Sequence, residues 1–100
     1  MTKHIVVWRL FDFADGSSKQ ENALKLQEKL LSLPGKIPQI KKIEVGINVD
    51  RTDAASDVVL YSEFDSLEDL RTYQKHPEHQ KVVEFLNRVR SEKRVVDYEM

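Results

Sequence analysis

The sequence predicts an α+β fold over residues 1–100, a ferredoxin-like sandwich in which helices cover one face of a four-stranded antiparallel sheet. Strand-like apolar runs occur near both ends of the chain and twice in its middle, and helical apolar spacing lies between them in two places. No linker, repeat or low-complexity tract divides the sequence into further domains. The element order is therefore β-α-β-β-α-β, which right-handed crossovers and a central hairpin fold into a split βαβ sandwich.

The first strand is expected at residues 5–11, where β-branched and aromatic residues are apolar on both alternating faces. This pattern is typical of a central strand that is covered on both sides. Turn-forming residues 15–17 end it. The next helix begins with a capping box, in which the Ser18 hydroxyl and the Glu21 carboxylate satisfy free amides.

The middle of the chain continues with the body of this helix and a pair of strands. The helix is expected to end at Pro34-Gly35, and polar residues 50–56 join the strands at 43–49 and 57–64 as a loose hairpin loop. The apolar stripe of the helix consists of Ala23, Leu26, Leu30 and Leu33, widened by Leu24 and Leu31.

A second helix begins at Ser66, an N-cap residue followed by an acidic first turn. Pro77 interrupts it, because proline clashes with the preceding turn and lacks an amide donor. The helix resumes over residues 82–89. The charged run at residues 88–94 is interpreted as a solvated helix end, and a last strand is expected at residues 94–99.

Composition excludes several classes of protein. The 16 basic and 17 acidic residues give a formal net charge of −1, which argues against a non-specific nucleic-acid binder. The absence of cysteine excludes disulfide scaffolds, iron–sulfur centres, thiol enzymes and cysteine zinc sites. No apolar run approaches the roughly 20 residues of a membrane span, and the N-terminal run is too short for a signal peptide. We therefore expect a cytoplasmic protein with no nucleic-acid or membrane partner.

One face of the predicted sheet is left without a covering helix, although its strands are apolar on both faces. The strand at residues 57–64 carries Leu60 on one face and Tyr61 on the other. A second copy of the chain is the simplest cover for such a face. We therefore expect a homodimer whose sheets face each other, with Val6 and Leu60 at the interface.

Residues 73–79 concentrate side chains suited to acid–base chemistry around the helix break. His79 lies in the first turn after Pro77, where the helix dipole disfavours the imidazolium. The neutral ring can then accept a proton as a general base while the Tyr73 hydroxyl donates to a developing oxyanion. A structural interpretation also stands, in which His79 caps or packs the resumed helix and Tyr73 belongs to the helix core.

A metal site at the same place is a weaker interpretation. His76 and His79 are three residues apart with Glu78 between them, a spacing that places two ligands on one helix face. Pro77 disrupts that face, and the sequence offers no third ligand. We therefore expect no metal.

The first strand adds a third histidine. His4 shares a strand face with Val6 and Trp8. A histidine on an apolar strand face is either a hydrogen-bonded structural residue or a polar group inside an apolar pocket. Trp8 either lines that pocket or fills it.

The chain resembles the stress-responsive α/β-barrel (Dabb) domain family nearly from end to end. The segments that carry the resemblance are Lys3-His4-Ile5-Val6, Ile43-Glu44-Val45-Gly46, Val59 to Phe64, Tyr73 to Val83 and Val96-Asp97-Tyr98. The resemblance implies a dimeric α+β barrel, formed when two ferredoxin-like protomers pack sheet to sheet. Most members have no assigned activity, and some plant members are polyketide cyclases that close a ring by aldol condensation without a cofactor. In those cyclases, the resemblance implies, a histidine matching His79 is the base, a tyrosine matching Tyr73 assists it, and a histidine matching His4 lies in the pocket.

Two departures from the cyclase pattern are present. Trp8 stands where the cyclases have a smaller aliphatic residue, and Leu26 and Leu30 stand where they place aromatic residues toward the substrate. The catalytic candidates are His79 and Tyr73, and the ligand-binding candidates are His4, Val6, Trp8, Leu26 and Leu30, with no cofactor and no metal.

Three functions are compatible with these residues. The first is a homodimeric barrel protein without assigned activity that binds a small apolar molecule or serves only as a stable module in a stress response. The second is a cofactor-free lyase or cyclase with a histidine base and a tyrosine acid. The third is a related barrel monooxygenase acting on quinol-like or haem substrates, which only the histidines support. A pocket of at least about 300 Å³ that reaches His79 and Tyr73 favours catalysis, whereas a pocket filled by Trp8 and the leucines disfavours it.

Overall fold

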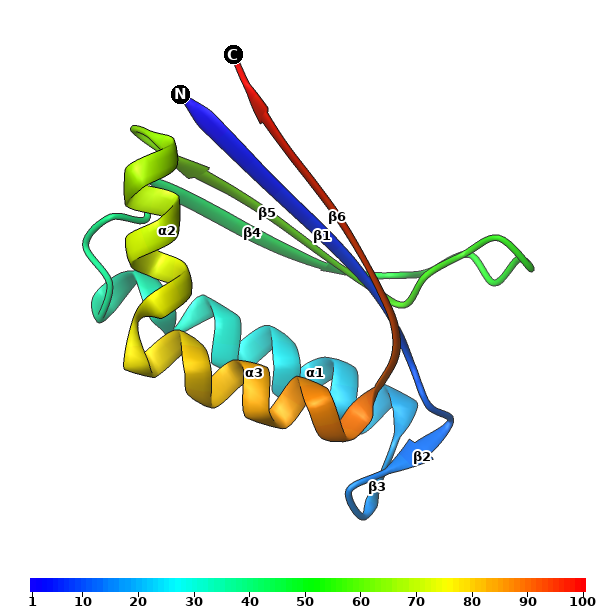
Figure 1. The fold of residues 1–100 in the computed structure, drawn as a ribbon. Helices are drawn as coiled ribbons and strands as arrows, with labels where there is room; N and C mark the ends of the chain where they lie inside the picture. The colour runs from blue at the N-terminus through cyan, green and yellow to red at the C-terminus, as the bar shows by residue number, and fades with distance from the viewer.

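The computed structural model describes residues 1–100 and contains one main sheet with three α-helices on one side of it (Figure 1). The elements are β1 (Thr2–Leu10), β2 (Phe13–Ala14), β3 (Ser17–Ser18), α1 (Lys19–Leu31), a 3-10 helix (Leu33–Gly35), β4 (Lys42–Ile47), β5 (Val58–Phe64), α2 (Leu67–Lys75), α3 (Pro77–Val89) and β6 (Arg90–Glu99). This order confirms the predicted plan and adds a small hairpin, β2–β3, before α1.

The main sheet has the strand order β4-β5-β1-β6, and every neighbouring pair is antiparallel. This is the ferredoxin-like arrangement that the sequence predicts. Strand β1 is central and pairs with both β5 and β6 along nearly its whole length. The two chain ends therefore lie side by side (Figure 1), and the Met100 amide donates to the Met1 carbonyl at 2.9 Å.

Side chains of β1 alternate between the two faces of the sheet. Even-numbered residues are buried beneath the helices, and odd-numbered residues are half-buried on the face without helices, here called the open face. Val6 and Leu60 pair in register and are each 2% exposed, so they belong to the core beneath the helices. The prediction that they lie at the open face is wrong, because a strand that is apolar on both faces does not reveal which face the helices cover.

The helices begin where the sequence predicts. Ser18 and Glu21 form the capping box of α1, and Ser66 caps α2 by accepting from the Asp69 amide. The apolar stripe of α1 is narrower than predicted, since Leu24 and Leu31 are 55% and 48% exposed. None of the helices has the length and apolar content that crossing a bilayer requires.

The charged run at residues 88–94 is mostly strand rather than helix end. Helix α3 stops at Val89, and β6 begins at the next residue because Arg90 pairs with Leu10 of β1. The last strand is therefore four residues longer at its start than the predicted strand at 94–99.

The loop between β4 and β5 is anchored rather than loose. Asp57, 3% exposed, accepts from the Leu10 amide at 2.8 Å and from Arg51 at 2.5 Å, and it lies 3.5 Å from the Lys19 ammonium. Its own amide donates to the Trp8 carbonyl at 2.8 Å. Burial raises the pKa of Asp57, but the Leu10 hydrogen bond and the two cations outweigh it and hold the pKa below its usual range.

We expect Asp57→Asn to lower the free energy of unfolding at pH 7 by about 2 kcal/mol, because a neutral amide loses charge-assisted hydrogen bonds. The folded-state pKa is depressed, so this stabilisation is present above the unfolded-state pKa, about 3.9, and is lost as pH falls through the folded-state pKa. Urea unfolding between pH 2 and 7 measures the difference between wild type and variant. The exposed loop variant Asp53→Asn is the control, and an equal loss in both variants would contradict the anchoring role.

Candidate functional site

A small pocket of about 80 Å³ lies between the sheet and the helices. Six of the seven predicted site residues line it, namely His4, Val6, Trp8, Leu30, Tyr73 and His79. The seventh, Leu26, is fully buried in the core and is not part of the lining. The other lining residues are Leu60, Gln74, Val82, Val83, Leu86, Lys93 and Val95.

The helix break brings Tyr73 and His79 together. Helix α2 ends at Lys75, and His76 has extended backbone angles and caps α3, accepting from the Glu78 amide at 3.1 Å. Across this break the ring centroids of Tyr73 and His79 are 4.4 Å apart. The Nδ1 of His76 is therefore occupied by the Glu78 amide. The structure contains no cluster of three or more side chains that could hold a metal ion.

His79 is held in a form that can accept a proton. Its Nδ1 lies 3.1 Å from the Gln74 carbonyl oxygen. Because a carbonyl only accepts, Nδ1 carries the hydrogen, and Nε2 of the neutral ring is the free acceptor. Burial lowers the pKa of His79; the Gln74 carbonyl opposes this shift, and the nearby His4 and Lys93 add to it. The neutral imidazole is thus the form favoured near pH 7.

Tyr73 offers a hydrogen-bond donor in the same pocket. The residue is fully buried, its hydroxyl has no partner in the protein, and burial raises its pKa. The phenol therefore stays protonated, and its O–H group is a donor without an acceptor in the protein. The rings of Phe64 and His4, with centroids 5.0 and 6.2 Å away, pack around it.

Asp97 orients His4 and was not among the predicted site residues. The Nδ1–H of His4, a residue only 5% exposed, donates to the Asp97 carboxylate at 2.5 Å. The contact arises because the two residues pair across β1 and β6. A pairing between the fourth and the ninety-seventh positions of a chain depends on strand register, which the local spacing of residues does not specify.

Trp8 both lines and fills the pocket. It is 3% exposed, and its indole Nε1 has no hydrogen-bond partner. The remaining volume of about 80 Å³ is well below the roughly 300 Å³ typical of sites for larger ligands. The structure therefore brings the acid–base residues together but leaves room only for a small molecule.

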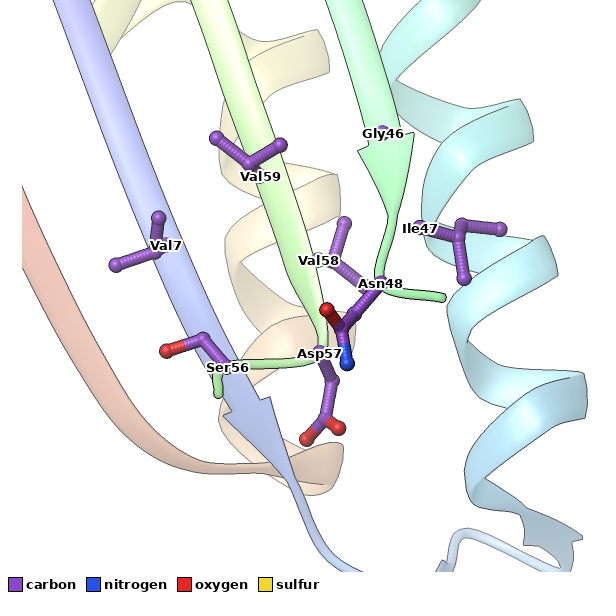
Figure 2. Close-up of a pocket in the computed structure, with 8 residues that line it drawn as sticks. All are labelled: Val7, Gly46, Ile47, Asn48, Ser56, Asp57, Val58 and Val59. Atoms are coloured by element: carbon purple, nitrogen blue, oxygen red, sulfur yellow. The ribbon is translucent and has the colours of Figure 1, made fainter. Parts of the chain in front are cut away.

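A larger depression of about 260 Å³ lies where β4 ends and β5 begins (Figure 2). Its lining consists of Val7, Gly46, Ile47, Asn48, Ser56, Asp57, Val58 and Val59, none of which is a predicted site residue. Val7 and Val59 are neighbours in register on the open face, and Gly46 adds no side chain beside them. A Cβ at Gly46 would lie 3.1 Å from a methyl carbon of Val59. Because glycine has no side chain, it leaves the space beside Val59 on the open face unfilled.

Comparison with known proteins identifies relatives of the whole chain. The family model described as "Stress responsive A/B Barrel Domain" matches residues 2–100. Among solved structures, the chain is similar to a dimeric protein of unknown function with a ferredoxin-like fold from Bacteroides fragilis. The two are 36% identical with a TM-score of 0.85, and the match covers 99% of this chain and 95% of that chain.

Two more distant structures have names that state an activity. One is hydroxynitrile lyase from Passiflora edulis, with 20% identity, a TM-score of 0.78 and coverage of 99% of this chain and 92% of that chain. The other is an antibiotic biosynthesis monooxygenase, with 16% identity, a TM-score of 0.72 and coverage of 100% and 98%. At these identities the likeness shows a shared fold alone. No curated protein sequence matches the chain.

Proposed function

The chain belongs to the stress responsive A/B barrel domain family over residues 2–100, and we propose that it forms a homodimer that binds a small, mostly apolar molecule in the pocket of each protomer. The observation that carries the proposal is the composition of the pocket. Most of its lining is apolar, and the polar groups of His4, Tyr73 and His79 converge on it. An apolar cavity with a few convergent polar groups is the usual form of a ligand site.

The size of the pocket defines the size of the ligand. The volume of about 80 Å³ is roughly a quarter of the 300 Å³ at the lower end of the range for ligand pockets, so the proposed ligand has only a few non-hydrogen atoms. A polyketide chain exceeds this volume several times. The proposed ligand is therefore smaller than the substrates of the plant cyclases that the sequence resembles.

The open face supports the homodimer. Its apolar side chains come from three neighbouring strands and remain half-buried or exposed in one protomer. They are Ile5, Val7, Val59, Tyr61 and Val96. An apolar patch of this kind marks an association surface, and the relative from Bacteroides fragilis is described as dimeric. A net charge of −1 per chain gives little repulsion between copies.

We expect Val59→Asp to convert the dimer into a folded monomer. Val59 is 38% exposed in one protomer, so the charge costs the single chain little, whereas in an interface it is buried without a partner. Sedimentation velocity at tens of micromolar gives the mass, and circular dichroism reports folding. Val49→Asp, at a loop residue that is 97% exposed, is the control and should remain dimeric. A wild-type monomer, or a dimer that survives Val59→Asp, would contradict this interface.

Ligand binding can be tested with methylenecyclobutane, a five-carbon hydrocarbon of suitable size. We expect saturable changes in the amide NMR signals of the pocket residues around Tyr73 and His79. Val83→Phe should abolish these changes, because Val83 is half-buried at the pocket and a larger side chain there occupies the ligand volume.

Val49→Phe makes the same substitution away from the pocket and should leave binding intact. Signals that respond around Val7 and Val59 instead, or no saturable response to either methylenecyclobutane or the similarly sized ketone cyclobutanone, would refute the proposed ligand site.

Acid–base catalysis on a small carbonyl compound is a second candidate function. The observation that favours it is the neutral His79 ring, whose Nε2 is free because Nδ1 donates to Gln74. Nε2 can take a proton from the carbon beside a carbonyl group, and the C–H electron pair then forms the carbon–carbon double bond of an enolate. The negative charge moves to the carbonyl oxygen, which the Tyr73 hydroxyl can stabilise by donating a hydrogen bond. The imidazolium then exchanges its proton with solvent, and delivery of the solvent-derived proton to carbon regenerates the carbonyl compound and neutral His79 without any cofactor.

We expect the protein to exchange the protons beside the carbonyl of cyclobutanone for deuterium in D₂O, which NMR measures directly. His79→Gln should lower the protein-dependent rate about a hundredfold or more. The rate should also fall as pH drops through the depressed pKa of His79, below 6.5, because the imidazolium cannot accept a proton.

His76→Asn is the matched control, since asparagine preserves the N-cap of α3. If cyclobutanone binds but wild type and His79→Gln exchange it equally, the protein is a binder and not a catalyst of this step.

A further inference from the structure

The pocket meets solvent along β6, an edge strand of the main sheet (Figure 1). Lys93 and Val95 line the pocket from this strand, and both residues are exposed. The other residues of the lining are buried or half-buried. Because a residue that lines a pocket and is also exposed belongs to its rim, the entrance of the pocket lies beside Lys93 and Val95.

Strand register directs the Lys93 side chain to the pocket side of the sheet. Lys93 pairs with Trp8 across β6 and β1, and Val95 pairs with Val6 in the same way. Residues that lie opposite each other in a sheet point to the same face. Trp8 and Val6 are buried beneath the helices, so Lys93 also leaves the sheet on the face that the helices cover.

Lys93 brings a positive charge without a partner to this entrance. It forms none of the ion pairs of the protein. No aspartate or glutamate lines the pocket, and Asp97, on the same face of β6, is bonded to His4. Burial is the main cause of the lowered pKa of His79, and the charges of His4 and Lys93 add to it, so the Lys93 ammonium acts on the pocket. The entrance therefore favours an anion and disfavours a cation.

The rim and the inner wall of the pocket favour different parts of a ligand. Val6, Leu30 and Leu60 make the inner wall apolar, and a charged group against them would lose its hydration. An alkyl group gains from burial there. At the exposed rim a carboxylate keeps contact with water and can pair with the Lys93 ammonium. A short molecule with an alkyl group at one end and a carboxylate at the other satisfies both requirements.

We infer that Lys93 binds the carboxylate of a short-chain monocarboxylic acid whose alkyl group occupies the pocket. This inference rests on the proposed ligand site and names its ligand class. Lys93 is then a specificity-determining residue, because it distinguishes a carboxylate from a neutral molecule of the same shape.

The test compares isobutyrate with isobutyramide, which has the same branched carbon skeleton and no charge. At pH 7 we expect both compounds to cause saturable changes in the amide NMR signals around Tyr73 and His79. Wild type should bind isobutyrate roughly two- to fivefold more tightly than isobutyramide, the effect of one exposed ion pair. Lys93→Gln should bind the two compounds equally, and Lys93→Arg should keep the preference because arginine retains the charge.

Lys75→Gln is the matched control. Lys75 is also exposed and free of ion pairs, but it does not line the pocket. This variant removes the same charge and should keep the preference for isobutyrate. Both lysines are exposed, so we expect the variants to fold, and circular dichroism checks this.

The outcomes separate this inference from the proposed function. If wild type binds the acid and the amide equally, the ligand site stands and the role of Lys93 is overturned, leaving Lys93 as a charge that protects the β6 edge from pairing with other strands. A preference for isobutyrate that survives Lys93→Gln, or that Lys75→Gln also removes, overturns it as well. If methylenecyclobutane or cyclobutanone binds and isobutyrate does not, the ligand class is wrong. If none of the four compounds binds, the proposed ligand site itself fails.

Discussion

The alternation of side chains along β1 is the constraint on which the rest of the molecule depends. Successive residues of a strand point to opposite faces, so one nine-residue strand supplies both surfaces of the proposed assembly. His4, Val6 and Trp8 point toward the helices and build the pocket. Ile5 and Val7 point to the open face, where a second copy is proposed to bind. A shift of one residue in the register of β1 would exchange the two sets and abolish both surfaces.

The break between α2 and α3 is the second element that shapes the pocket. A continuous helix would place residues 73 and 79 about one and two-thirds turns apart, on different sides of its axis. The extended backbone of His76, followed by Pro77 in the first turn of α3, redirects the chain so that the two rings approach within 4.4 Å. The same break leaves the Gln74 carbonyl free of a helical partner and available to fix the tautomer of His79. The break in the helix thus sets the geometry of the proposed acid–base pair and the tautomer of His79.

Much of the architecture was predictable because local chemistry specifies it. The capping box at Ser18, the N-cap at Ser66, the break at Pro77 and the alternation in the strands each follow from a few neighbouring residues. Features that depend on pairing between distant residues were not predictable. The face of the sheet that the helices cover determines that Val6 and Leu60 lie in the core. The register between β1 and β6 places Asp97 beside His4.

The candidate site was likewise predictable in its residue types and unpredictable in its packing. The sequence indicated His79, Tyr73 and His4 as the chemical residues, and six of its seven predicted positions line one pocket. The volume of that pocket depends on how Trp8 and the leucines pack, which composition and spacing do not specify. The free donors of Trp8 and Tyr73 became visible only once every acceptor around them was placed.

The anchoring of the loop after β4 also determines how this fold can tolerate changes in length. Both ends of the loop are fixed. The Asn48 amide donates to the Asp57 carbonyl at 2.8 Å, the Asp57 amide donates to the Trp8 carbonyl, and the Asp57 carboxylate accepts from the Leu10 amide. Doubling the length of a flexible loop costs only about 0.6 kcal/mol of closure entropy. Insertions around Thr52 to Ala55 can therefore be accommodated at little cost in stability and without moving Trp8, so the pocket is insulated from changes in the length of this turn.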